Sequence, residues 1–198
     1  MAAKRAEPPF PRYEARTSAA WREWLQDNHS RAPGVWLVTF KKGSGEPYLP
    51  YGEAVDEALA FGWIDSLPRK LDDKRTMLLM TPRKDGSSWS QLNKRRVERL
   101  IAEGRMAEAG FIKVKAAKKD GSWDRLNEVD ALVMPLDLMA AFKADPLALE
   151  HFEAFPPSSR RGILEWILNA KRPETRARRI DETVRLASLN RKANHYRQ

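Results

Sequence analysis

Every strand-like segment of this chain comes before residue 83, whereas every apolar pattern after residue 88 repeats at helical spacing. The run Val35–Phe40 is rich in β-branched and aromatic residues and therefore predicts a strand. Ile64–Lys70 and Arg75–Thr81 predict a β-hairpin whose second arm is a central strand, because both of its faces are apolar. Strands followed by helices are typical of an α+β fold. We expect a small antiparallel sheet with packed helices in the N-terminal part and an all-helical C-terminal part.

The helices are predicted from caps, prolines and a spacing of three or four between apolar residues. Trp21, Trp24 and Leu25 form one such apolar face near the N-terminus. A later helix, over about Ala107–Lys119, is expected to direct Phe111 and Val114 inward. The remaining helices are expected to begin near Pro50, Ser88, Pro135, Pro146, Ser158 and Pro173, the last with Ala177, Ile180, Val184 and Ala187 inward.

A chain of 198 residues is long enough to bury a core, as one domain or as two small, closely packed ones. We expect a flexible arm over 1–16, an α+β core over 17–124, a helical segment over 125–190 packed on that core, and a basic tail over 191–198. The first ten residues are charged, and no run approaches the length of a membrane span. A cytoplasmic protein without a signal peptide is therefore expected.

The residue types limit the chemistry that is available. The chain has no cysteine, which excludes disulfides, thiolate metal sites and a cysteine nucleophile. His29, His151 and His195 are too scattered to indicate a histidine-rich metal site. The sequence also lacks the P-loop, GxGxxG, HExxH and GxSxG signatures. We therefore expect no metal and no cofactor.

Basic residues are concentrated in two segments. The chain carries 36 Lys and Arg against 27 Asp and Glu, and its net charge is +9. Residues 82–105 contribute +4 and residues 171–198 contribute +6, so the rest of the chain is nearly neutral. Clustered cations are expected where a protein binds a polyanion, although solvated helix faces give the same pattern. The candidate nucleic-acid contacts are Lys94, Arg95, Arg99, Arg172, Arg178 and Arg179.

Two motifs have the residue types of a small-molecule site. Thr81–Lys84 ends a strand and leads through Ser87–Ser90 into a helix, an arrangement in which free N–H groups and cations capture an anion. Ordinary helix capping by these serines is the alternative. Glu53 and Asp65 lie on either side of Trp63 in a second motif, and paired carboxylates perform acid–base chemistry if burial shifts one pKa. In the alternative interpretation, Trp63 belongs to the core and Asp65 bonds a nearby turn.

Several colinear motifs together carry a family resemblance. They are Gly34–Val38 with Lys41 and Lys42, Tyr51–Val55 through Phe61–Asp65, Thr81–Arg83, Trp89–Lys94, Leu100–Met106 and Ala170–Arg176. Through them, from about Trp21 to Leu189, the chain resembles the bacterial YdeI/OmpD-associated family, also called the bacteriocin-protection family. The resemblance implies a genetic link to peptide-antibiotic tolerance and to an outer-membrane porin. Ala60 stands where that family often has cysteine, which excludes thiol chemistry here.

Our leading hypothesis is a non-enzymatic, stress-associated cytoplasmic module with a cleft for a small anionic ligand. Nucleic-acid binding through the two basic helices is the first alternative, and an enzyme using Glu53 and Asp65 is the second. The oligomeric state stays open. The leading hypothesis predicts that Arg83→Ala abolishes ligand binding and leaves the melting temperature nearly unchanged. Its ligand contacts are Lys41, Lys42, Trp63, Arg83, Trp89, Asn93 and Arg176.

Overall fold

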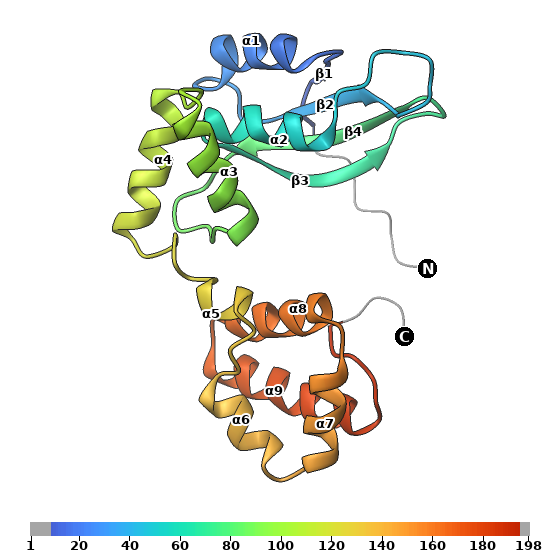
Figure 1. The fold of residues 1–198 in the computed structure, drawn as a ribbon, viewed down its shortest axis with the longest axis vertical. Coiled ribbons are helices and arrows are strands. Elements are labelled where there is room, and N and C mark those ends of the chain that lie inside the picture. The colour runs from blue at the N-terminus through green and yellow to red at the C-terminus, as the bar shows by residue number, and fades with distance from the viewer. Residues whose placement is uncertain (1–8, 195–198) are drawn as a thin grey trace. The chain divides into compact units, whose positions relative to one another are not determined.

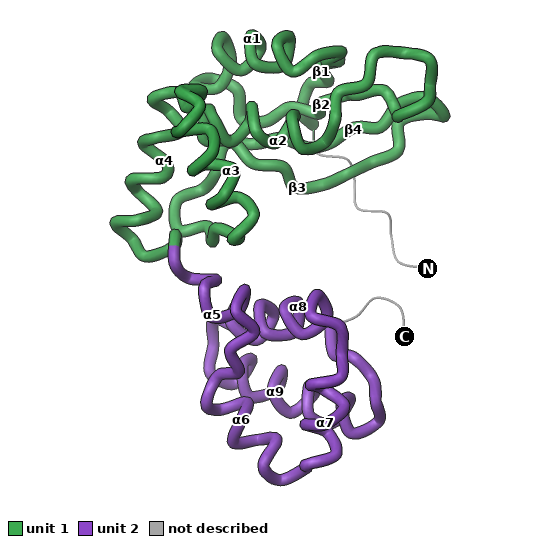
Figure 2. The backbone as a smooth tube through the Cα atoms, in the orientation of Figure 1, with its two compact units in different colours: residues 1–123 green, residues 124–198 purple. Residues whose placement is uncertain are grey.

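The computed structural model describes residues 9–194 and divides the chain into two compact units, residues 1–123 and residues 124–198 (Figure 1, Figure 2). Residues 1–8 of the expected arm and 195–198 of the expected tail, His195 included, lie outside the described residues. No buried apolar cluster of the described residues draws on both units. The α+β fold is confirmed, with the sheet in the first unit and helices alone in the second.

The sheet of the first unit has four strands in the order β1-β2-β4-β3. They are β1 (Arg12–Glu14), β2 (Val35–Phe40), β3 (Trp63–Lys70) and β4 (Arg75–Pro82). The predicted hairpin is present as β3 and β4, which pair antiparallel, and β4 is a central strand as expected. The expectations of a flexible arm reaching residue 16 and of an antiparallel sheet are wrong, because β1 pairs parallel with β2. The sheet is therefore mixed.

Both faces of this sheet are apolar. Along β2, Val35 and Leu37 belong to the main core of the first unit, whereas Trp36 and Val38 belong to a smaller cluster on the opposite face. This division follows the alternation of side chains along a strand. The residues that pack beside Trp36 include Phe10, which lies just before β1. The edge strand β1 thus begins two residues after Phe10, whose apolar packing holds the chain against the sheet.

Four helices complete the first unit. They are α1 (Ser18–Asn28), α2 (Tyr51–Ala60), α3 (Gln91–Ala102) and α4 (Glu108–Lys119). Helix α2 packs against α1, α3, α4 and β3, and its residues 54–60 are all buried. Gly62, at φ +73°, turns the chain from α2 directly into β3. Val114 of α4 is buried as expected, but Phe111 is 40% exposed, so its predicted inward position is wrong.

The second unit consists of helices around a core of its own. They are α5 (Asn127–Asp130), α6 (Leu136–Phe142), α7 (Pro146–Ala154), α8 (Pro157–Leu168) and α9 (Pro173–Ser188). Prolines begin several of them, because proline at a first helical position loses no intrahelical hydrogen bond. On α9, Ile180 and Ala187 are buried as predicted, whereas Ala177 is exposed. Within residues 9–194, no helix has both the length and the hydropathy needed to cross a membrane.

Candidate functional site

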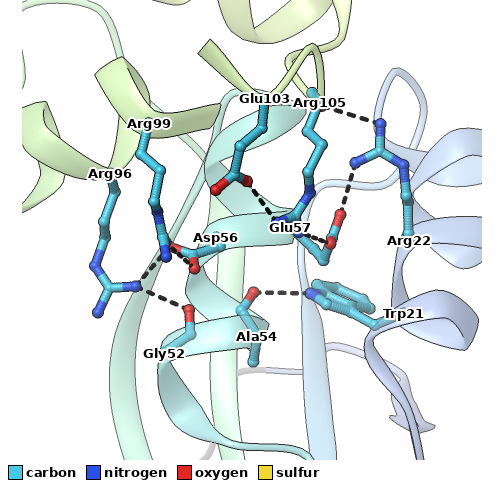
Figure 3. A network of polar contacts seen from close by, with 10 residues as sticks. All are labelled: Trp21, Arg22, Gly52, Ala54, Asp56, Glu57, Arg96, Arg99, Glu103 and Arg105. Atoms are coloured by element: carbon cyan, nitrogen blue, oxygen red, sulfur yellow. Dashed lines mark hydrogen bonds and ion pairs between the residues drawn. The ribbon is translucent and has the colours of Figure 1, made fainter. Parts of the chain in front are cut away.

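Helix α2 carries two adjacent carboxylates into the core of the first unit. Asp56 is 5% exposed and Glu57 is 3% exposed, within a stretch that is otherwise Ala, Val and Leu (Figure 3). A buried carboxylate is unfavourable unless cations and hydrogen bonds compensate for the water it has lost. The partners of these two residues therefore determine how the helices around α2 are held.

Two arginines from different elements hold Glu57 (Figure 3). Arg22 of α1 donates to one carboxylate oxygen at 2.7 Å, and Arg105, just after α3, donates to the other at 2.5 Å. Arg22 also donates to the carbonyl of Arg105 at 3.0 Å, and Arg105 pairs with Glu103 at 2.9 Å. This network fastens α1 and the end of α3 to the middle of α2.

Asp56 is held by two arginines of α3. Arg96 donates to it at 2.6 Å and Arg99 to its second oxygen, while Arg96 also donates to the carbonyl of Gly52 at 2.8 Å (Figure 3). These contacts set α3 beside the first turn of α2. Asp56 and Arg96 were not among the residues predicted from the sequence. The available signal was an acidic pair inside an otherwise apolar helical stretch.

The packing of α3 beside α2 leaves a surface groove of about 470 Å³, which we call the arginine groove. It is lined by Pro50, Gly52, Glu53, Asp56, Leu92, Arg95, Arg96 and Arg99. Arg95 is exposed and forms no ion pair with any of the residues 9–194, and half of the Arg99 side chain is exposed. The three arginines outweigh Glu53 and Asp56, so the groove is positive by one charge.

A second hollow, which we call the apolar pocket, has a volume of about 270 Å³. Its lining is Leu37, Thr39, Tyr48, Leu49, Tyr51, Ala54, Asp65, Pro68, Thr76, Met77 and Leu78. The Tyr51 hydroxyl donates to Asp65 at 2.9 Å, and burial together with this hydrogen bond raises the pKa of Tyr51 to about 12. Glu53 and Asp65 thus line two different hollows.

Three of the predicted ligand contacts are part of the core. Arg83 is 4% exposed, its guanidinium carbon lies 3.7 Å from the centre of a Trp89 ring, and it donates to the carbonyl of Ser88. Burial lowers the pKa of Arg83 to about 10, which leaves it charged at neutral pH. Trp63 and Trp89 are each 1% exposed, and Trp63 donates to the His29 carbonyl at 3.1 Å. Neither ring offers a free stacking surface, which corrects the role expected for it.

Lys41, Lys42 and Asn93, which were also predicted to contact the ligand, do not lie in one site with Arg83. Lys41 donates to the carbonyls of Asp72 and Asp73 in the β3–β4 turn at 2.9 Å, and Lys42 beside it is exposed. Arg83 follows the opposite end of β4, so roughly 27 Å of strand separates the two regions. Asn93 is half-buried in the first turn of α3, where its N–H donates to the Ser90 hydroxyl.

Arg176 belongs to the second unit and has its own partner. It donates to both oxygens of Asp137, at 2.6 and 2.9 Å. The same hydrogen bonds hold the pKa of the Asp137 carboxyl below its usual range. This bidentate pair fastens α9 to α6, which is a structural role.

The candidate nucleic-acid contacts differ in exposure. Lys94 is only 4% exposed and lies 5.6 Å from a Trp123 ring centre. Arg179 donates to the Trp166 carbonyl and lies over the Trp166 ring. Arg172 and Arg178 are exposed on the second unit, and Arg95 and Arg99 line the arginine groove on the first. Only part of the predicted basic surface therefore faces solvent.

No group of three or more His, Cys, Asp or Glu side chains in residues 9–194 is arranged to hold a metal ion. The fold and these hollows define an α+β protein whose sheet-bearing unit presents a positive groove and an apolar pocket near the start of α2. They do not define a reaction.

Comparison with known families finds a matching family model for a segment of each unit. The chain belongs to the family whose model covers residues 13–113, just over half of its length, and which is described as a domain of unknown function, DUF8412. Residues 131–190 match the model of the family described as "Bacteriocin-protection, YdeI or OmpD-Associated", which is consistent, over this segment, with the resemblance seen in the sequence. No curated protein and no solved structure was found to match the chain.

Proposed function

We propose that this protein is a non-enzymatic, stress-associated binding module that takes a small anionic ligand in the arginine groove. The observation that carries the proposal is the row of Arg95, Arg96 and Arg99 along one side of an open hollow. Asp56 forms ion pairs with both Arg96 and Arg99 and holds them in position. Its single negative charge offsets only one of their two positive charges. Arg95 has no ion-pair partner among residues 9–194 and is free to meet a ligand.

The first turn of α2 also favours an anion in the arginine groove. No side chain caps the N-terminus of α2, and Gly52 and Glu53 from that turn line the groove. Helix N-termini favour anions because their first N–H groups lack partners and because the helix dipole is positive there. The description of the family matched by residues 131–190 as bacteriocin-protection supports the stress-associated part of the proposal.

The test is calorimetric titration of the full chain with inorganic pyrophosphate. Arg95→Ala should weaken binding about tenfold, because a hydrogen bond to a charged group contributes roughly 1.5 kcal/mol. Glu53→Gln should strengthen binding, since Glu53 is the lining carboxylate that forms no ion pair with residues 9–194. Arg125→Ala is the matched control: it removes an exposed arginine elsewhere and should leave the dissociation constant unchanged. Equal effects of Arg95→Ala and Arg125→Ala would refute a localised site.

Nucleic-acid binding is the second candidate function. The exposed positions of Arg172 and Arg178 on the second unit, and of Arg95 on the first, favour it. Fluorescence polarisation of labelled duplex DNA should then show an affinity that falls steeply with salt, with a slope of about −0.9 per phosphate neutralised. Arg178→Ala should reduce that slope by about one. Absence of binding at low salt would leave the small-anion proposal alone.

A further inference from the structure

We propose that the apolar pocket is a second, separate binding site, which takes a small organic cation consisting of one aromatic ring and a short ammonium side chain. The pocket differs chemically from the arginine groove. Asp65 is the single charged residue of its lining, so the pocket is negative where the groove is positive. The two hollows therefore select ligands of opposite charge.

Asp65 is available to a ligand. One of its carboxylate oxygens accepts the hydrogen bond from Tyr51, and neither oxygen forms an ion pair with residues 9–194. Arg83 interacts electrostatically with Asp65, but among residues 9–194 the two side chains form no ion pair within 4.0 Å. Asp56 and Glu57, the carboxylates of α2 nearby in sequence, are each already held by two arginines. Asp65 thus has an open position for a cationic donor.

The tyrosines at the pocket complement an ammonium group. Tyr48 is 44% exposed and Tyr51 is 54% exposed, and both line the same pocket as Asp65. Cations are attracted to the faces of tyrosine rings. The Tyr51 phenol is protonated at neutral pH, as an unperturbed tyrosine is, and its raised pKa of about 12 extends that protonated state to more alkaline pH. It therefore orients Asp65 by donating a hydrogen bond and adds no charge of its own.

The rest of the lining fits a compact apolar body. Leu37 and Leu78 lie opposite each other in the register of β2 and β4, and they face the same side of the sheet. Thr39 and Thr76 extend this floor toward the end of β2. The volume of about 270 Å³ lies just below that of pockets for drug-sized ligands, which are roughly 300–1,000 Å³. One ring with a short chain is the size of ligand that this hollow accommodates.

The experiment titrates the full chain with three probes of similar size, followed by two-dimensional NMR of the amide groups. The probes are phenethylamine, 2-phenylethanol and phenylacetate, which carry a positive, no and a negative charge. Phenethylamine should bind at least tenfold more tightly than the alcohol, phenylacetate should bind most weakly, and the shifts should centre on Thr39, Thr76 and Leu78.

Variants separate charge from shape. Asp65→Asn should reduce phenethylamine affinity to that of 2-phenylethanol without changing the affinity for the alcohol, and Asp65→Glu should retain the preference for the amine. Asp27→Asn, which removes an exposed acidic charge on α1, is the matched control and should change nothing. Circular dichroism checks that each variant is folded. If Asp65→Asn does not fold, the order of the three probes on the unaltered chain decides the question.

Four results would overturn the proposal. They are equal binding of the amine and the alcohol, no binding of the amine at millimolar concentration, an amine affinity that survives in folded Asp65→Asn, and shifts that centre outside the pocket. None of these results bears on pyrophosphate binding in the arginine groove, so the two proposals stand or fall separately.

Discussion

Arg83 lies with its guanidinium carbon 3.7 Å from the centre of a Trp89 ring, and only 4% of the residue is exposed. It donates one hydrogen bond to the Ser88 carbonyl, while its buried Nε has no hydrogen-bond partner among residues 9–194. The Arg83 guanidinium therefore makes its contacts inside the protein, by packing on the Trp89 ring and by one hydrogen bond to a backbone carbonyl. A ligand would have to displace these contacts to use it.

We expect Arg83→Ala to lower the melting temperature by roughly 5–8 °C, equivalent to about 2 kcal/mol, because it removes the stacking contact and the hydrogen bond. Arg83→Met should lower it less, since it keeps most of the packing and removes the unsatisfied Nε. Lys84→Ala, at an exposed neighbour, is the control. Differential scanning calorimetry measures all three. An unchanged melting temperature in Arg83→Ala would instead favour the ligand-contact role that the sequence predicts.

At the scale of elements, α2 is the helix that contacts α1, α3, α4 and β3 in the first unit. Its buried carboxylates fix α1 and α3 through arginines, and its C-terminal end meets α4. The N–H of Ala107 donates to the Ala60 carbonyl at 3.0 Å, and a Cβ at Gly110 would lie 2.3 Å from the same carbonyl oxygen. Glycine at 110 is therefore what allows α4 to approach α2 this closely.

Gly110→Ala is accordingly expected to destabilise the first unit by about 2–3 kcal/mol, since α4 has to move away and weaken the bond to Ala60. Urea denaturation measures this change. Gly162→Ala, in the middle of α8, is a control of opposite sign, because apart from its chain neighbours and its own helix backbone no atom of residues 9–194 lies within 4 Å of the added Cβ. It should stabilise the protein by about 0.5–1 kcal/mol. Equal effects of the two substitutions would contradict the close approach.

At the scale of the whole molecule, the chain divides between Trp123 and Asp124 into two units, each with its own buried cluster. The second unit buries Leu138, Phe142 and Phe152, among others, without drawing on the sheet. A unit with its own core has the main requirement for folding alone.

We therefore expect two thermal transitions in the full chain, and we expect Gly110→Ala to move only one of them. Residues 124–198 expressed alone should retain the other transition, measured by circular dichroism. The short connections in the sequence predict instead that the helical part packs on the core as one unit. A single transition that Gly110→Ala shifts as a whole would support that prediction and contradict independent folding.

The sequence determined the local elements of this protein, because their signals are carried by neighbouring residues. β-branched runs predicted β2 with the bounds it has, and caps and prolines predicted most of the helices. Residue type does not reveal burial, so the sequence could not show which of the predicted ligand contacts are exposed. Trp63, Trp89 and Arg83 have the chemistry of ligand contacts and are almost completely buried.

The tertiary structure alone decided the features that depend on distant partners. The parallel pairing of β1 with β2 has no signal in three residues of edge strand, because it depends on the strand beside it. Asp56 is stable in the core because Arg96 and Arg99 reach it from α3, some forty residues along the chain. The same packing created the arginine groove, whereas the turn into β3 brought Asp65 to Tyr51. Sequence spacing fixes neighbours along one element, and only packing brings together side chains from several.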